Sequence, residues 1–173
     1  MTSTFAIAGK LAREYLLPLN GSPRLDSPGG NLLYAMSGLA VWDKSVALIA
    51  RVNREYPQEW IKDFQTRGLD VEGVYVDPES DRVDIRSFIA YTDTNERSST
   101  NAVSHFARRE MTFPKSLLGY HPPDTTVKDL RETDPLSPAA RFVPKEYRSI
   151  GFLHICPFDF TSQSQMVNLF KGG

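Results

Sequence analysis

Residues 27–43 decide the fold expected for this chain: Ser27-Pro-Gly-Gly-Asn-Leu-Leu-Tyr-Ala-Met-Ser-Gly-Leu-Ala-Val-Trp-Asp43. After the two glycines, apolar side chains recur at helical spacing, which predicts a helix. These side chains are Leu32, Leu33, Met36, Leu39 and Ala40. Backbone N–H groups at a helix start can hold hydroxyl oxygens or anions, and glycine permits close approach. Two adjacent glycines are also explained by a simple turn, so the pair alone does not establish a site.

The residues before this turn predict a strand and a hairpin. Phe5-Ala-Ile-Ala-Gly9 is a short apolar run closed by glycine, which is typical of a buried strand. Asn20-Gly21 is a strong turn signal, and it lies inside residues 11–26. We therefore expect a protruding pair of strands between the first strand and the glycine pair.

The residues after the turn predict alternating strands and helices. The nearly continuous apolar run 45–52 is typical of a strand that is buried on both faces of a parallel sheet. Pro57 suits the first turn of a helix with an apolar stripe, and Gly68 suits its C-terminal cap. A further strand is predicted at residues 71–76. This order indicates an α/β fold with a mostly parallel sheet flanked by helices.

The second half of the chain is less regular. The strand predicted at residues 83–91 is mixed on both sides, so it is expected to be partly exposed or to cover a ligand, and a polar loop is expected at 92–100. Residues 111–148 predict an irregular insertion with short helical turns around 126–131, since five of the 12 prolines lie between Pro122 and Pro144.

A further buried strand and a helix are predicted near the end of the sequence. Residues 150–156 form an apolar run, and Thr161 is the expected cap of a helix with Met166, Val167, Leu169 and Phe170 on its apolar side. The last helix of an α/β sheet normally leads into a further strand, so we expect the 173 residues to be the N-terminal portion of one larger domain.

The composition excludes several classes of protein. Twenty basic and 21 acidic residues give a net charge of −1, which argues against a nucleic-acid binder. No apolar run approaches the roughly 20 residues that span a bilayer, and residues 1–9 lack a signal-peptide pattern. A single cysteine, Cys156, excludes an internal disulfide framework and is expected to be a small buried hydrophobe. We expect a cytoplasmic protein with no membrane or nucleic-acid partner.

Common catalytic and metal-binding motifs are absent from the sequence. The three histidines, His105, His121 and His154, show no HxH or HxxxH spacing, so no metal site is predicted and His154 is expected to be a core or strand-end residue. There is no GxxxxGK[ST], GxGxxG or GxSxG. A Rossmann-type nucleotide domain is therefore a weaker alternative.

The order of the segments resembles the N-terminal half of the ribokinase-like, or PfkB-type, carbohydrate kinases. The segments that carry the resemblance are Ile7-Ala-Gly9, Ser27-Pro-Gly-Gly30, Val46–Val52, Arg67-Gly-Leu-Asp-Val71 and Asp84–Asp93. It covers about residues 5–93 and, more loosely, 150–170. The resemblance implies a ribokinase-like fold with a small β lid from segments 11–26 and 83–91, and with the C-terminal part of the fold missing.

The resemblance also implies a set of substrate-binding residues. The family's sugar-binding acid, counted from Gly9, falls at Glu14, where a carboxylate would accept hydrogen bonds from two vicinal hydroxyls. Gly29 and Gly30 match the family's glycine pair, and Phe88 would close over a sugar from the lid. Glu14 is otherwise explained as a solvated surface charge, and Phe88 as packing within the lid.

Two positions depart from the family's pattern. The family's asparagine, four residues after the second glycine, falls on Tyr34, while Asn31 directly follows the pair and is a candidate substitute. The family's Gly-x-Asp turn becomes Asn53-Arg54-Glu55, which loses the glycine and keeps an acid.

The resemblance implies an ATP-dependent carbohydrate kinase that phosphorylates a hydroxyl of a sugar or nucleoside. The family's catalytic base and its ATP and Mg²⁺ sites lie in the C-terminal half, so no catalytic residue is expected in this chain and the chain alone is expected to be inactive. A homodimer through the lid is also expected. The alternative is a non-catalytic sugar-binding or scaffold protein on the same fold.

Overall fold

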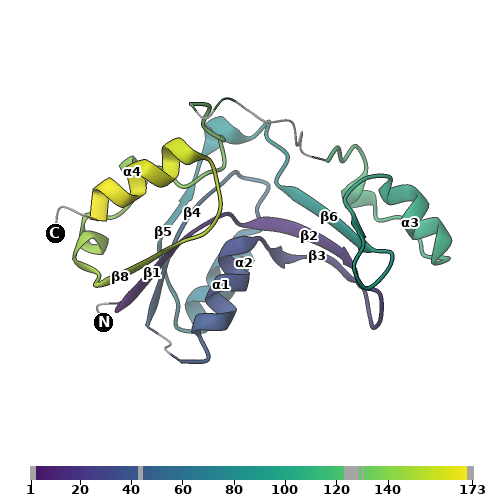
Figure 1. Cartoon of the computed structure of the whole chain (residues 1–173), viewed down its shortest axis with the longest axis horizontal. Coiled ribbons are helices and arrows are strands. Elements are labelled where there is room, and N and C mark those ends of the chain that lie inside the picture. The colour runs from purple at the N-terminus through teal and green to yellow at the C-terminus, as the bar shows by residue number, and fades with distance from the viewer. Residues whose placement is uncertain (1–2, 43–44, 123–128, 130, 171–173) are drawn as a thin grey trace.

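Two β-sheets form the framework of the chain, whose structure is a computed structural model (Figure 1). The structure describes residues 3–42, 45–122, 129 and 131–170. The main sheet has the strand order β5-β4-β1-β8, and all of its strands are parallel. Its strands are β1 (Phe5–Ala8), β4 (Val46–Val52), β5 (Asp70–Val76) and β8 (Phe152–Ile155). The α/β fold and its parallel sheet are therefore confirmed.

The burial of the main-sheet strands follows their place in the sheet. β1 and β4 lie in the middle and are almost completely buried, as continuous apolar runs in a parallel sheet should be. β8 is an edge strand among the described residues, with alternate residues exposed. The prediction of a buried strand there was wrong in one respect, because no described helix covers the face that carries Phe152 and His154.

Helices cover both faces of the main sheet (Figure 1). Helices α1 (Asn31–Leu39) and α2 (Gln58–Thr66) pack on one face, and α4 (Phe160–Phe170) packs on the other. Gly68, with φ of 92°, ends α2 as predicted, and its N–H bonds to Gln65 O.

The ends of two helices follow from their local contacts. α1 ends at Leu39, and the side chains of Val41 and Trp42 that follow it are exposed. α4 begins at Phe160, and the Asp159 carboxylate accepts the Ser162 N–H at 2.8 Å. Asp159 therefore caps this helix, and the prediction of Thr161 as the cap was wrong.

The second sheet extends from the end of β1 and has the order β3-β2-β6-β7 (Figure 1). β2 (Ala12–Leu17) and β3 (Arg24–Gly29) form the predicted hairpin around Gly21, and β6 (Arg86–Tyr91) pairs with β2 in parallel. β6 begins later than expected because the Asp84 carboxylate accepts the Arg86 N–H in a local turn.

Two elements were not predicted from the sequence. β7 (Arg97–Ser98) lies inside the expected loop and pairs with the end of β6. α3 (Ala102–Arg108) covers one face of the second sheet, where Phe106 packs against Tyr15 and Phe88. The side chains packed between α3 and this face form a separate small core, distant from the helices of the main sheet (Figure 1).

The predicted irregular stretch contains only short 3-10 turns among its described residues, at Lys115–Leu117, Ala140–Phe142 and Lys145–Ser149. The helical turns predicted around 126–131 lie outside the described residues, apart from 129 and 131. Tyr147 anchors the end of the stretch, since its hydroxyl donates to Asp70 and accepts the Gly73 N–H. The insertion thus packs on the main sheet through its side chains.

Candidate functional site

The glycine pair lies where the second sheet returns to the main sheet. Gly30 has φ of 99°, and a Cβ there would lie 2.3 Å from the Lys10 carbonyl oxygen. A Cβ on Gly29 would lie 2.5 Å from the Cβ of Glu14. Both positions therefore need glycine, Gly30 for its backbone conformation and Gly29 for close packing. The pair is more than a generic turn, because it allows the carboxylate of Glu14 to fold over the backbone.

Glu14 lies on β2, opposite Ser27 of β3 and Ser87 of β6. It is only 3% exposed, so it is not a solvated surface charge. The Tyr34 hydroxyl, from the first turn of α1, donates a 2.6 Å hydrogen bond to Glu14 Oε2. Burial, and then the hydrogen bond to Glu14, raise the pKa of Tyr34 to about 12. The phenol therefore stays protonated and donates across the neutral range.

Three of the predicted residues, Glu14, Gly29 and Tyr34, line one hollow of about 270 Å³ between the second sheet, α1 and α2. Arg24 and Arg67 also line this hollow. The Arg67 guanidinium is paired with Asp63 at 2.8 Å, one turn earlier on α2. The hollow thus combines a buried acid, a phenol and two cations, which suits a small molecule that carries hydroxyl groups.

Gly30 and Asn31 line a different hollow, of about 450 Å³, together with Lys10, Asp84 and Ser87. The side chain of Asn31 is engaged at both ends. Its Oδ1 accepts the Lys10 N–H at 2.8 Å, and its Nδ2 donates to the Pro157 carbonyl oxygen at 2.6 Å. Asn31 therefore ties the ends of β1 and β8 to the start of α1, and it does not lie beside Glu14.

Phe88 lies on the opposite face of the second sheet from Glu14. Its cross-strand neighbour is Tyr15, and successive residues of a strand point to opposite faces. Phe88 is completely buried beneath α3, against Phe106. The structure thus corrects the prediction that Phe88 closes over a ligand, because a side chain in this core cannot reach either hollow.

In the Asn53-Arg54-Glu55 turn, the side chain of Asn53 is hydrogen-bonded to backbone groups. Asn53 is completely buried, and its Nδ2 donates to the carbonyl oxygens of Ser80 and Val83. Its Oδ1 accepts the Glu55 N–H at 3.1 Å. This asparagine therefore links the end of β4 to the segment that leads into the second sheet.

The charged residues that line the hollow beside Gly30 and Asn31 were not predicted. The Lys10 ammonium pairs with Asp134, which lies 124 residues later in the irregular stretch. The Arg86 guanidinium pairs with Asp84 and donates to two carbonyl oxygens, of Ser116 and Leu118. No local pattern in the sequence could have paired Lys10 with so distant an acid. Within the described ranges, no three His, Cys, Asp or Glu residues are placed to hold a metal ion.

Solved structures with similar folds are available for comparison. An E. coli protein described as a candidate ribokinase II matches with a TM-score of 0.60 and 14% identity, over 99% of this chain and 50% of that chain. Its complex with ATP and Mg²⁺ gives a TM-score of 0.58 with the same identity and coverage. A PfkB protein from Polaromonas sp. JS666 gives 0.55 and 12% identity, over 98% of this chain and 52% of that chain.

The chain has a ribokinase-like fold. It spans about half the length of these ribokinase-like structures. No protein-family model matches the sequence, and no curated protein is significantly similar to it. Among the described residues, no helix is long and apolar enough to cross a membrane.

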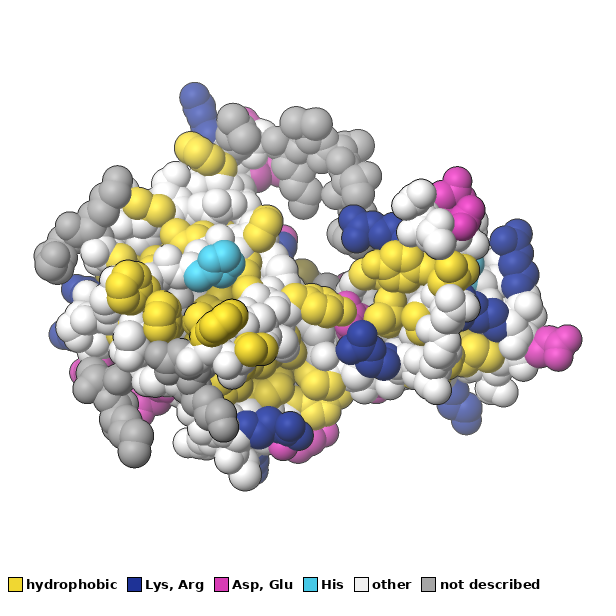
Figure 2. Space-filling view, turned by 60° about the horizontal axis from the view of Figure 1, so that its bottom comes forward, with side chains coloured by type: hydrophobic (Ala, Val, Ile, Leu, Met, Phe, Trp, Pro, Cys, Tyr) yellow, Lys and Arg dark blue, Asp and Glu magenta, His cyan; other side chains and the backbone are white. Residues whose placement is uncertain are grey.

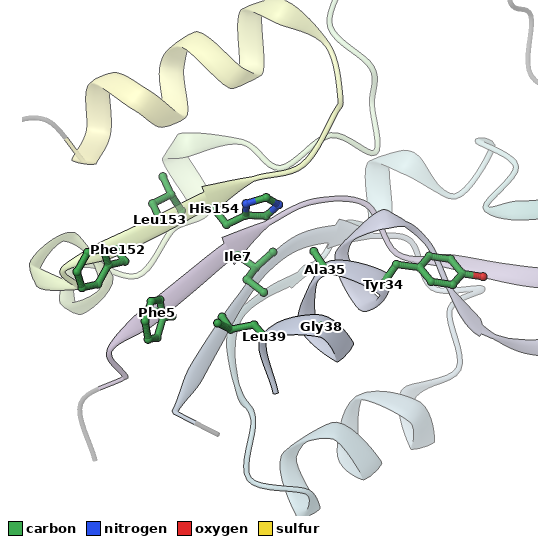
Figure 3. A pocket seen from close by; sticks show the side chains of 9 residues that line it. All are labelled: Phe5, Ile7, Tyr34, Ala35, Gly38, Leu39, Phe152, Leu153 and His154. Atoms are coloured by element: carbon green, nitrogen blue, oxygen red, sulfur yellow. The ribbon is translucent and has the colours of Figure 1, made fainter. Parts of the chain in front are cut away.

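An apolar groove of about 450 Å³ lies between α1 and the edge strand β8 of the ribokinase-like sheet (Figure 3). Phe5, Ile7, Leu39 and Phe152 form its walls, and the Phe5 and Phe152 rings stack at 5.2 Å. Phe152 is 61% exposed. Figure 2 shows hydrophobic side chains gathered on the surface of the main-sheet half. The face of β8 beside α1 is thus apolar and uncovered by the described residues.

Proposed function

We propose that this chain is the N-terminal, acceptor-binding part of an ATP-dependent kinase that phosphorylates a hydroxyl of a sugar or nucleoside. One observation carries the proposal. Glu14 is a nearly completely buried carboxylate beside the glycine pair, and Tyr34 is its only hydrogen-bond donor among the described side chains. A carboxylate offers about four acceptor positions, so Glu14 can accept further hydrogen bonds in the hollow that it lines. The hydroxyls of a polyol would supply the donors.

The proposed role of these residues is to position the acceptor. Glu14 would hold its hydroxyls, and the Gly29 backbone would let it approach. Phosphoryl transfer proceeds through a loose transition state, so correct placement of the acceptor is a large part of catalysis.

We propose ATP and Mg²⁺ as cofactors of the complete protein. In the family that the chain resembles, their site and the catalytic base lie in the C-terminal half. No residue of the chain is therefore proposed as the base.

The apolar groove supports the proposal that the chain is part of a larger fold. Parallel sheets are normally covered on both faces, and an edge strand leaves backbone groups free to pair. On the α1 side, the groove is lined by the small residues Ala35 and Gly38. A Cβ added to Gly38 would meet nothing within 4 Å. We propose that a further α/β segment covers the groove with a helix and extends the sheet beyond β8. The half of the solved structures that this chain does not span is the model for that segment.

A non-catalytic sugar-binding protein is the second candidate. The observation in its favour is the Glu14–Tyr34 hydrogen bond, since a tyrosine stands where the resemblance expects an asparagine. Steady-state assay of the complete protein with ATP separates the two candidates. ATP-dependent phosphorylation of ribose or adenosine supports the kinase, and polyol binding without turnover supports the binding protein. Turnover by the purified 173-residue chain alone would contradict the proposal of a missing half.

Calorimetry with Glu14→Gln tests the role of the acid. Hydrogen bonds to a charged group contribute about 1.5–3 kcal/mol, so affinity for ribose or adenosine should fall about 10- to 100-fold. The control is Glu72→Gln, which removes an exposed carboxylate from β5. Equal affinity in the wild type and Glu14→Gln would remove the basis for the assignment. The cytoplasmic location and the homodimer through the second sheet stay predictions.

A further inference from the structure

The hydroxyl of Tyr34 occupies one acceptor position of the carboxylate that the proposed acceptor would need. It bonds to Glu14 Oε2 at 2.6 Å, across 20 residues of sequence and between α1 and the second sheet. A charge-assisted bond of this length is among the stronger hydrogen bonds in proteins. A pair of vicinal hydroxyls that bridges both carboxylate oxygens needs access to Oε2 as well as Oε1. The Tyr34 contact on Oε2 therefore competes with an acceptor of that kind.

The ring of Tyr34 is accessible although its hydroxyl is bound. The residue is 53% exposed, so no surrounding core holds it in place. It lines both the hollow beside Glu14 and the apolar groove between α1 and β8. In Figure 3 the ring points away from the other groove residues and toward the second sheet. A rotation about the side-chain torsions would move the ring out of the first hollow, with apolar surface close by to receive it.

We infer that Tyr34 is a specificity-determining residue that closes the acceptor site, and that a vicinal diol must displace its hydroxyl from Glu14 to bind. This inference rests on the proposed acceptor role of Glu14. The raised pKa of the phenol agrees with this contact, because a buried hydroxyl that donates to a carboxylate holds its proton more tightly. An acceptor that offers only one hydroxyl to Glu14 can bind beside the phenol. An acceptor that needs both carboxylate oxygens must break the Tyr34–Glu14 hydrogen bond, which weakens its binding.

The Tyr34→Phe variant tests the inference by gain of affinity. It keeps the ring and removes the competing hydroxyl, so calorimetry should show ribose binding at least about 10-fold tighter than in the wild type. Tyr34→Asn, which shortens the side chain, should give a gain in the same direction. The matched control is Tyr75→Phe, because Tyr75 stacks on Phe142 away from both hollows. Thermal melts of each variant establish that it is folded.

A second measurement follows Tyr34 directly. With ¹³Cζ-labelled tyrosine, the resonance that is absent from Tyr34→Phe should still report a mostly protonated phenol at about pH 11, where an ordinary tyrosine is mostly ionised. Saturating ribose should lower the pH at which this resonance titrates, because the displaced phenol loses its carboxylate partner. Titration near the ordinary tyrosine value without ribose would show that the contact is absent and would overturn the inference.

The outcomes separate this inference from the proposed function. If the wild type binds ribose and Tyr34→Phe binds it equally or more weakly, the phenol is not a competitor, and the inference is wrong while the acceptor role of Glu14 stands. If wild type, Tyr34→Phe and Tyr34→Asn all fail to bind ribose and adenosine, the acceptor role fails and the inference falls with it. Binding by the variants alone would be the strongest support.

Discussion

Substitution of Gly29 by alanine should destabilise the protein through a specific steric conflict. The added Cβ would lie 2.5 Å from Glu14 Cβ and 2.9 Å from Glu14 Oε2, whereas ordinary contact begins at 3.4 Å. β3 and β2 are paired through Ala12 and Gly29, so the strand cannot move away without losing ladder hydrogen bonds. Either the strands separate or the buried carboxylate is pushed from Tyr34.

The expected magnitude comes from two opposing terms. Overpacking of a well-packed site costs about 1–3 kcal/mol. Replacement of glycine by alanine also restricts the unfolded chain, which returns about 0.4–1 kcal/mol. The net loss in unfolding free energy is then about 0–2.6 kcal/mol, or a fall in Tm of up to about 10 °C for a domain of this size.

Urea unfolding followed by circular dichroism measures this change, and Gly38→Ala is the matched control. A Cβ on Gly38 meets nothing within 4 Å, and alanine is the better helix former, so that variant should gain about 0.5–1 kcal/mol. Gly38→Ala should therefore be more stable than Gly29→Ala. A Gly29→Ala protein that gains as much stability as Gly38→Ala would show that Glu14 does not fold over this glycine.

Three further predictions concern the surroundings of the site. Asp77→Asn should lower the unfolding free energy measured in urea by about 3 kcal/mol, because it leaves the Arg51 guanidinium without its buried partner. The control is Asp63→Asn, which breaks the exposed pair with Arg67 and should cost less than about 0.5 kcal/mol. Burial opposes ionisation of Asp77, but hydrogen bonds from Ser80, Arg51 and the Glu79 N–H outweigh it and hold its pKa below the ordinary value. The stability that Asp77 contributes is therefore complete above the unfolded-state value of about 3.9 and is lost as the pH falls through the folded-state value, so acid unfolding monitored by circular dichroism should be less steep in Asp77→Asn. Asn31→Ala should cost about 1–3 kcal/mol and speed amide exchange at the Lys10 N–H; an unchanged exchange rate would contradict the tie between β1 and β8. Phe152→Ser should change the unfolding free energy of this chain by less than about 0.5 kcal/mol, and it should reduce the binding of a hydrophobic dye to the apolar groove. Phe106→Ala, at a completely buried position, should cost about 3–5 kcal/mol. A large loss of stability in Phe152→Ser would mean that the groove is already covered.

The fold was largely predictable because its signals are local. Continuous apolar runs marked β1 and β4, and the Asn20-Gly21 turn marked the hairpin of the second sheet. Gly68 marked the end of α2. α3 escaped prediction because it is short and keeps a single buried side chain, Phe106, whose partners come from the second sheet.

The candidate site was predictable only in part. The family resemblance named Glu14, Gly29 and Tyr34, and the structure brings these three residues to one hollow. Asn31 lies outside this hollow, because its side-chain amide is hydrogen-bonded to backbone groups at the ends of β1 and β8. The structure also removes Phe88, because a shift of one residue along a strand reverses the face to which a side chain points.

The sequence by itself determined the α/β class, the order of the strands and helices apart from β7 and α3, and the turn that needs two glycines, since each depends on residues close together in the chain. Tertiary structure alone decided that Glu14 is buried, that Tyr34 reaches it from α1, and that Lys10 meets Asp134. These contacts join residues 20 and 124 positions apart. Whether a carboxylate is a solvated charge or a buried acceptor depends on such distant partners, and no local pattern records them.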